Sequence, residues 1–113
     1  MPKPRNIVLI GATGSIGHST LAVLRQHPDE LNLVGIAAGR NRRQIDQIAH
    51  EFNIPQAATA VFDESGIGGL IDLATLPQAD IVLIAATGTV GIQPTLAALG
   101  AGKDIALASK EVL

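Results

Sequence analysis

Unbroken apolar runs alternate along this chain with amphipathic stretches, and this alternation predicts strands and helices in turn. Short apolar runs are typical of strands that are buried on both faces of a parallel sheet. They cover residues 7–10, 31–38, 80–86 and 104–108, and a weaker candidate strand covers residues 57–62. The pattern therefore predicts an α/β fold in one domain, a doubly wound parallel sheet with helices on both faces.

The helices are predicted from apolar residues spaced three and four positions apart. They run from Gly17 to before Pro28, from Asn41 to about Asn53, over residues 70–76 and over residues 92–101. Ser15 or Thr13 is the predicted N-cap of the first helix, and Asn41 is that of the second, because their side-chain oxygens accept from free backbone N–H groups. Residues 63–69 are rich in glycine and are predicted to form a loop.

Three glycines follow the first predicted strand. Gly11, Gly14 and Gly17 have the spacing G-x-x-G-x-x-G, which differs from the G-x-G-x-x-G of the commonest dinucleotide fingerprint. Gly11 would allow a tight turn, Gly14 would let backbone N–H groups approach a phosphate, and Gly17 would let the helix pack closely on the strand. The helix N-terminus would then bind an anion such as a pyrophosphate. The alternative is a glycine-rich connection without a ligand.

Composition and charge narrow the classes of function. The chain has 113 residues, 47% of them hydrophobic, and its two aromatic residues are both Phe, so its core must be built from Ala, Val, Ile and Leu. A net charge of −2 provides no basic surface for nucleic acid or an anionic membrane. The absence of cysteine excludes disulfides and thiolate metal sites and fits a cytoplasmic protein. The apolar runs are too short to predict a membrane span or a signal peptide.

An arginine cluster follows the second predicted strand. In a dinucleotide-binding fold, an acidic residue at this place binds the ribose 2′-hydroxyl of NAD, whereas a basic residue accommodates the 2′-phosphate of NADP. This chain has Arg40, Arg42 and Arg43 there and no carboxylate before Asp46. The cluster favours NADP, with Arg40 as the main candidate and Arg42 or Arg43 as steering charges. The alternative is a solvated, positively charged helix start.

Two further groups lie at the carboxyl ends of predicted strands, the edge at which open parallel sheets bind ligands. Ala85 and Ala86 are small enough for a flat ligand to lie against the backbone. Ser109, Lys110 and Glu111 follow the last strand and are either part of a site or a solvated strand end. The three histidines, His18, His27 and His50, are interpreted as surface residues, and no metal site is predicted because no ligand spacing is present.

Four motifs together resemble the N-terminal domain of the 1-deoxy-D-xylulose 5-phosphate reductoisomerase family. They are GATGSIG at 11–17, AAGRN at 37–41, PTLAAL at 94–99 with AGK at 101–103, and ALASKE at 106–111. The resemblance covers nearly the whole chain. It implies a Rossmann-like fold and NADPH-dependent conversion of 1-deoxy-D-xylulose 5-phosphate to 2-C-methyl-D-erythritol 4-phosphate in non-mevalonate isoprenoid biosynthesis. It also implies a divalent metal, Mg or Mn, in the full-length parent, and a homodimer.

The resemblance also implies roles for individual residues. Thr13, Gly14, Ser15 and Ile16 would hold the pyrophosphate, with Gly11 as a further cofactor-binding residue. Gly39, Arg40 and Asn41 would hold the adenosine ribose and its phosphate. Ala85 and Ala86 would line the adenine side or the cofactor groove, and Ser109, Lys110 and Glu111 would contact the nicotinamide end and the substrate. Lys110 and Glu111 are the catalytic candidates. The family usually has Asn in place of Ser109, and its segment between Glu51 and Asp80 is usually longer.

In the family, the metal ligands, the substrate phosphate site and the lid lie beyond the position of Leu113. We therefore expect residues 1–113 to be an NADP-binding domain without the catalytic and C-terminal domains, and inactive alone. Its parent would be cytoplasmic and act on a sugar phosphate, without nucleic acid or membrane partners. Two alternatives are the cofactor domain of another NADP-dependent oxidoreductase, of the semialdehyde dehydrogenase type, and a non-catalytic dinucleotide-binding module.

Overall fold

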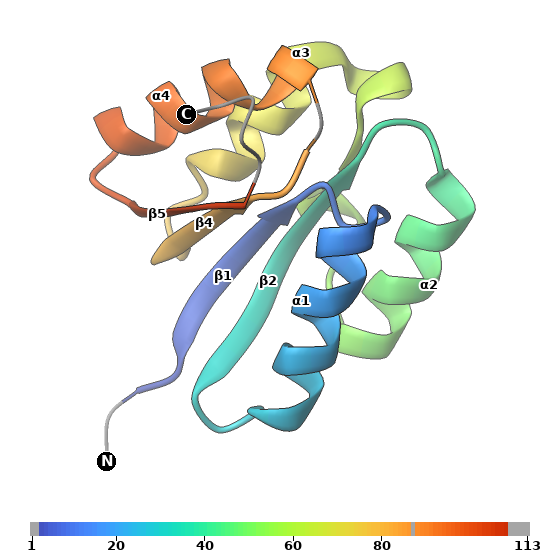
Figure 1. The fold of residues 1–113 in the computed structure, drawn as a ribbon, viewed down its shortest axis with the longest axis vertical. Helices are drawn as coiled ribbons and strands as arrows, with labels where there is room; N and C mark the ends of the chain where they lie inside the picture. Colours follow the sequence, from blue (N-terminus) through green and yellow to red (C-terminus); the bar gives the residue numbers. More distant parts are fainter. Residues whose placement is uncertain (1–2, 87, 109–113) are drawn as a thin grey trace.

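A computed structural model describes residues 3–86 and 88–108 and contains one sheet of five parallel strands. The strands are β1 (Arg5–Ile10), β2 (Leu31–Ala38), β3 (Thr59–Val61), β4 (Ile81–Ile84) and β5 (Asp104–Leu107). The helices are α1 (Ser15–Gln26), α2 (Arg42–Phe52), α3 (Phe62–Ala74) and α4 (Ile92–Gly100), with 3-10 turns η1 (Gln56–Ala58) and η2 (Gly88–Gly91). Helices α1 and α2 cover one face of the sheet, and α3 and α4 cover the other (Figure 1). The predicted doubly wound parallel sheet is confirmed.

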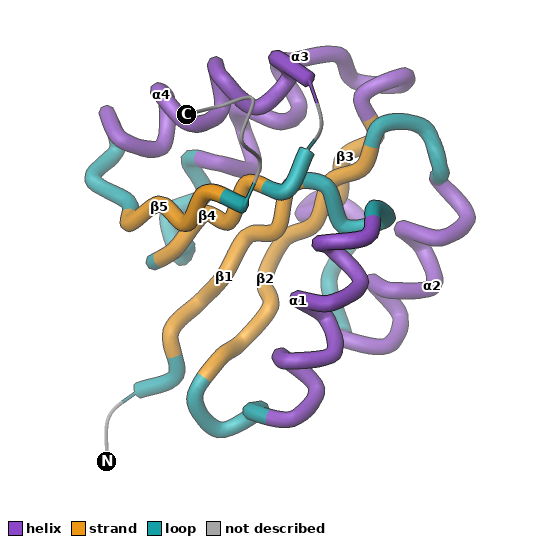
Figure 2. Tube along the Cα trace, viewed as in Figure 1, coloured by secondary structure: helices purple, strands orange, loops and turns teal. Residues whose placement is uncertain are grey.

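The strand order β3-β2-β1-β4-β5 places the first strand at the centre. The chain runs outward from β1 through β2 to β3, then crosses back over the other face to β4, which pairs with the free side of β1 (Figure 2). The winding direction therefore reverses between β1 and β4. In an open parallel sheet, ligands bind at the carboxyl ends of the strands beside such a reversal.

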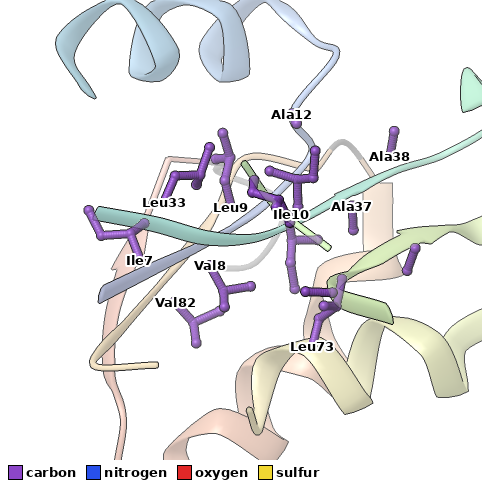
Figure 3. Packing of buried hydrophobic residues seen from close by; sticks show 14 of the residues in the cluster. Ile7, Val8, Leu9, Ile10, Ala12, Leu33, Ala37, Ala38, Leu73 and Val82 are labelled. Atoms are coloured by element: carbon purple, nitrogen blue, oxygen red, sulfur yellow. The ribbon is translucent and has the colours of Figure 1, made fainter. Parts of the chain in front are cut away.

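The core follows from the apolar strands. Val8, Leu9 and Ile10 of β1 are 0–1% exposed, because both faces of this central strand are covered. Their side chains alternate between the layers, and Leu9 lies with Leu33 on the α1 side, whereas Val8 lies with Val82 on the α3 side (Figure 3). The buried hydrophobic residues in the described part are all Ala, Val, Ile and Leu, as composition predicts.

The structure corrects the prediction for residues 63–69. They belong to α3, which begins at Phe62 and ends at Ala74, where a loop and a helix over 70–76 were predicted. Gly66 interrupts the helix with φ 66° and ψ −165°, so the local glycine pattern marks a kink. A Cβ on Gly69 would lie 2.0 Å from Oγ of Ser65, so a glycine there lets the helix resume beside that side chain.

The prediction for the start of α1 is also wrong. Gly14 is its N-cap, and neither Ser15 nor Thr13 provides a side-chain cap. The prediction for α2 is confirmed, because Oδ1 of Asn41 accepts a hydrogen bond from the backbone N–H of Gln44 at 3.1 Å. In the described part of the chain, no helix has both the length and the apolar character needed to cross a membrane.

Candidate functional site

A cleft of about 460 Å³ lies at the carboxyl ends of the strands. Its walls come from the turn after β1, the end of β2, the start of α3 and the segment after β4. The lining residues are Ile10, Gly11, Thr13, Gly14, Ala38, Gly39, Arg40, Phe62, Asp63, Leu70, Ala85, Ala86 and Val90. The fold thus brings together seven of the residues predicted from sequence to bind a cofactor, from three separate parts of the chain.

The turn after β1 requires glycine at two positions for packing. Gly11 has φ +97°, and a Cβ there would lie 2.6 Å from the carbonyl carbon of Ala85 and the nitrogen of Ala86. A Cβ on Gly17 would lie 2.2 Å from the carbonyl oxygen of Gly11. Because these neighbours are backbone atoms, no side chain can be accommodated without moving a strand end. Gly11 therefore lets the turn after β1 lie against the backbone that follows β4, and Gly17 lets α1 pack directly on the turn after β1.

Gly14 differs from the other two glycines of the turn. The nearest protein atom to a Cβ at Gly14 is 3.9 Å away, so protein packing does not require glycine here. The first hydrogen bond of α1 runs from the His18 N–H to the Gly14 carbonyl at 2.9 Å. Within residues 3–86 and 88–108, the exposed Ser15 and Ile16 donate no backbone hydrogen bond. These N–H groups lie at the positive end of the helix dipole and are available to an anion.

The end of β2 forms the neighbouring wall. Gly39 and Arg40 are exposed and line the cleft. Asn41 lies just beyond, and its amide is engaged with Gln44: Oδ1 accepts from the Gln44 backbone N–H, and Nδ2 donates to Gln44 Oε1, both at 3.1 Å. The side chain of Asn41 therefore holds the start of α2, next to the cleft.

The three arginines of the cluster have different environments. The Arg42 guanidinium donates to Glu64 of α3 at 2.8 Å, to Asp46 at 3.2 Å and to Thr59 of β3 at 3.0 Å. The hydrogen bond from Arg42 lowers the pKa of the Glu64 carboxyl, and the same bond raises the pKa of Arg42. Arg42 thus connects α2 to β3 and α3.

Arg43 lies on a separate shallow hollow along α2, which it shares with Arg42 and His50. Arg40 is the arginine of this cluster that lines the cleft. Sequence alone favoured Arg40 but did not settle which of Arg40, Arg42 and Arg43 contacts the 2′-phosphate. Their positions favour Arg40 as the ligand-binding cation.

Sequence reasoning missed the wall that α3 contributes. Phe62, Asp63 and Leu70 line the cleft, and the Asp63 N–H donates to the Gly39 carbonyl at 2.9 Å, which holds the start of α3 against the end of β2. The rule that parallel strands end at one edge, applied to the weak strand that ends at Val61, would have placed Asp63 there. Because residues 63–69 were predicted to form a loop, Asp63 was not considered as a lining residue.

Ser109, Lys110 and Glu111 lie outside the described residues. The nearest described position is Ala108, whose N–H donates to the Ile84 carbonyl at 2.9 Å, at the carboxyl end of β4. His18, His27 and His50 are exposed, as predicted. Among residues 3–86 and 88–108, no three His, Asp or Glu side chains gather in a way that could hold a metal ion.

A parallel sheet of order β3-β2-β1-β4-β5, with a glycine turn after its central strand and helices on both faces, defines a Rossmann-like α/β domain. The family model described as 1-deoxy-D-xylulose 5-phosphate reductoisomerase matches residues 7–66 and 63–113. The chain therefore belongs to the 1-deoxy-D-xylulose 5-phosphate reductoisomerase family. The two matched segments meet within the stretch from Glu51 to Asp80 that is expected to be shorter than in the family.

Individual relatives agree with this assignment. The chain is 42% identical to the reductoisomerase of Pelotomaculum thermopropionicum over an alignment of 126 positions, which covers 96% of this chain and 33% of that protein. A solved reductoisomerase in complex with magnesium superposes with a TM-score of 0.86 at 32% identity, covering 98% of this chain and 32% of that one. The Zymomonas mobilis enzyme in complex with NADPH has a TM-score of 0.81 at 31% identity, over 96% and 33%. The chain spans about a third of the length of the curated relatives it matches.

Proposed function

We propose that this chain is the NADPH-binding part of a reductoisomerase that converts 1-deoxy-D-xylulose 5-phosphate to 2-C-methyl-D-erythritol 4-phosphate. The observation that carries the proposal is the cleft that joins the open turn at Gly14 to Arg40 at the end of β2. Family membership and the solved relative in complex with NADPH support it. Family membership also favours this function over a semialdehyde dehydrogenase.

The cofactor would lie across the carboxyl edge of the sheet. Its pyrophosphate would bind at the start of α1, where the backbone N–H groups of Ser15 and Ile16 are free within the described part and where a side chain at Gly14 would enter open space. Its adenosine ribose and 2′-phosphate would lie over Gly39 and Arg40. We assign the pyrophosphate to Gly11, Thr13, Gly14, Ser15 and Ile16, and the ribose with its phosphate to Gly39, Arg40 and Asn41.

The other half of the dinucleotide would continue past β4. Ala85 and Ala86 line the cleft there and leave room for a flat ring against the backbone. We assign Ser109, Lys110 and Glu111 to the nicotinamide end and the substrate, with Lys110 and Glu111 as catalytic residues. NADPH supplies a hydride when it is bound, and the task of this chain is to orient it.

The remaining parts of the proposal concern the full-length protein. Because no metal-binding cluster is present in the described residues, we assign the divalent metal, Mg or Mn, to other parts of that protein, together with the sugar phosphate. Solved relatives in complex with magnesium support this. We also propose that it is a cytoplasmic homodimer. Exposed apolar side chains, Leu96 and Leu99 of α4 at 63% and 56% and Leu107 of β5 at 39%, offer surface for association.

A titration of reduced nicotinamide fluorescence tests the cofactor assignment. We expect NADPH to bind at least about tenfold more tightly than NADH, and Arg40→Ala to weaken NADPH about 10- to 100-fold with little effect on NADH, since hydrogen bonds to charged groups have this magnitude. Arg43→Ala is the matched control, because Arg43 lies on the separate hollow of α2. Equal affinities for the two cofactors, or no loss with Arg40→Ala, would contradict the proposal.

A further inference from the structure

We propose that Asp63 recognises the adenine base of the dinucleotide by accepting a hydrogen bond from its exocyclic amino group. This inference rests on the proposed NADPH-binding function and adds a specificity-determining residue to it. Asp63 is absent from the cofactor residues that the family resemblance implies, and it reaches the site only through the fold.

The placement of Asp63 follows from the order of the strands. The strands β1, β2 and β3 lie side by side, and each ends at the same edge. If the pyrophosphate binds after β1 and the ribose after β2, the base extends toward the end of β3. Asp63 is the second residue after β3, and its N–H bond to the Gly39 carbonyl at 2.9 Å fixes it beside the ribose position.

The surrounding wall has the chemistry of a purine site. Phe62 is half-buried and Leu70 is 2% exposed, and both line the same cleft as Asp63, so they offer apolar surface to the face of a ring. Gly39 and Arg40 line the same cleft, and an arginine guanidinium stacks well on flat rings. An ionised carboxylate at the rim is a pure acceptor and therefore complements a donor on the base.

Asp63 has no evident structural partner. Its neighbour Glu64 is paired with Arg42, whereas no side chain of the described residues forms an ion pair with Asp63. An acidic residue in the first turn of α3 stabilises the helix dipole, but Glu64 already occupies the same turn. A carboxylate close to a bound 2′-phosphate is also repelled by its like charge unless it accepts a hydrogen bond from the ligand. A donor on the ligand would offset that cost.

The test compares two bases that differ at the 6-position and at the neighbouring N1, which carries a hydrogen only in hypoxanthine. Adenine presents an amino donor at its 6-position, whereas hypoxanthine presents a carbonyl oxygen, which would face the carboxylate as a second acceptor. We expect the 113-residue chain to bind NADPH about tenfold more tightly than reduced nicotinamide hypoxanthine dinucleotide phosphate, measured by nicotinamide fluorescence. Asp63→Asn should bring this ratio close to one, because an amide can turn either its oxygen or its NH2 group toward the base.

Asp63→Ala should also bring the ratio close to one, through weaker binding of NADPH. Asp72→Asn is the matched control, since Asp72 is an exposed acid on the same helix that does not line the cleft. A merely structural role of Asp63 would lower both affinities together and leave the ratio unchanged, and that result would overturn the inference. A ratio of one in the unaltered chain would overturn it as well.

The failure of this inference can be told apart from the failure of the proposed function. If the chain prefers NADPH to NADH but does not distinguish adenine from hypoxanthine, only the role of Asp63 is refuted. If it binds neither NADPH nor its hypoxanthine analogue, the proposed function fails and the inference fails with it. Circular dichroism of each variant shows whether it has folded.

Discussion

Gly14 and Gly17 belong to the same turn but are glycine for different physical reasons. A Cβ on Gly17 would overlap the backbone carbonyls of Gly11 and Ala12, at 2.2 Å and 2.6 Å, so packing alone excludes any side chain. At Gly14 the space is open and the backbone has φ −84°, which every residue adopts. Protein packing therefore does not explain glycine at position 14, whereas the proposed binding of a pyrophosphate against the backbone would.

This difference predicts that two alanine substitutions in the turn act on different properties: one on stability and the other on NADPH binding. Gly17→Ala should destabilise the fold by about 1–3 kcal/mol, the usual cost of overpacking, because only backbone could move away. Gly14→Ala should cost less than about 1 kcal/mol, since alanine is a poorer N-cap than glycine but meets no atom. It should nevertheless weaken NADPH binding about tenfold by holding the pyrophosphate away from the N–H groups of α1.

Urea unfolding followed by circular dichroism gives the stabilities, and nicotinamide fluorescence gives the affinities. Each variant is the control for the other, because the same side chain is added three residues apart in one turn. A Gly14→Ala variant that binds NADPH as tightly as the unaltered chain would remove the start of α1 from the site. A Gly17→Ala variant of unaltered stability would show that β1 and α1 can separate without cost.

Sequence predicts residue roles well where the role is local. The turn at Gly11, the close packing at Gly17 and the cap at Asn41 could be assigned because they depend on neighbours within a few positions, although the predicted cap of α1 by Ser15 or Thr13 was wrong. The arginines could not be separated in this way. Arg42 is paired with Glu64, 22 residues away, and nothing in the spacing of the cluster reveals that bond. The pairing of Arg42 with Glu64 and the position of Arg40 in the cleft both depend on the tertiary fold.

At the scale of elements, the Arg42–Glu64 pair joins the start of α2 to the start of α3, the two helices that flank the end of β3. Gly39, at the end of β2, and Asp63, in the first turn of α3, also line the cleft. The Asp63 N–H donates to the Gly39 carbonyl. The hydrogen bond from Arg42 lowers the pKa of the Glu64 carboxyl. A carboxyl group with a lowered pKa in the folded state stabilises the fold above its unfolded pKa, and this contribution is lost as the pH falls through the folded-state value.

We therefore expect Glu64→Gln to change the pH dependence of stability. The variant should be less stable than the unaltered chain at pH 7, and the difference should shrink as the pH falls below about 4.5, the ordinary value of a glutamate. Urea unfolding at pH 7 and at pH 3.5 measures this difference. The Glu64 side chain is 50% exposed and that of Arg42 is 27% exposed, so water and salt still screen the pair, and the effect should be modest and decrease at high salt.

Glu30→Gln is the matched control, since Glu30 is exposed and makes no ion pair within the described residues. It should leave the pH dependence of stability unchanged. If Glu64→Gln and the unaltered chain lose stability in parallel between pH 7 and pH 3.5, the bond between α2 and α3 does not contribute to the folded state in solution.

The strands could be predicted from the sequence, and α3 could not be predicted in full. Apolar runs identify the strands because β4 and residues 7–10 of β1 are covered on both faces, which leaves no polar position within those runs. In α3, the glycines led to the prediction of a loop, because glycine is a weak helix former. Whether it is tolerated in a helix depends on the packing around it. Gly69 is such a position, since its missing side chain leaves room for Ser65. The spacing of apolar and polar residues does not reveal that Ser65 occupies the space beside Gly69.

At the scale of the whole molecule, the proposed function places a site for a large anion in a chain of net charge −2. The positive potential is local: it comes from the start of α1, where no acidic residue lies in the first turn, and from Arg40. The contrast with α3, which carries Asp63 and Glu64 in its first turn, shows that the two helix starts on this edge have different electrostatic characters. This charge distribution favours the start of α1 over the start of α3 for the proposed phosphate binding.

The proposed function assigns cofactor binding to this chain and catalysis to the full-length protein. The described residues provide a cleft for a dinucleotide but no cluster that could hold a metal ion, and the chain spans 33% of its relative from Pelotomaculum thermopropionicum. If metal and substrate are bound by other parts of the full-length protein, this chain should bind NADPH and still lack turnover. Millimolar magnesium chloride should leave its NADPH affinity unchanged, apart from the screening that any salt of equal ionic strength produces.

Two measurements on the 113-residue chain check this separation: fluorescence titration of NADPH with magnesium chloride or with sodium chloride of equal ionic strength, and loss of NADPH absorbance in the presence of 1-deoxy-D-xylulose 5-phosphate and magnesium. We expect equal affinities in the two salts and no substrate-dependent oxidation. A substrate-dependent rate would mean that these residues complete a catalytic site, and a specific gain in affinity with magnesium would mean that they bind the metal. Either result would require metal or substrate ligands within this chain, which the described residues do not bring together.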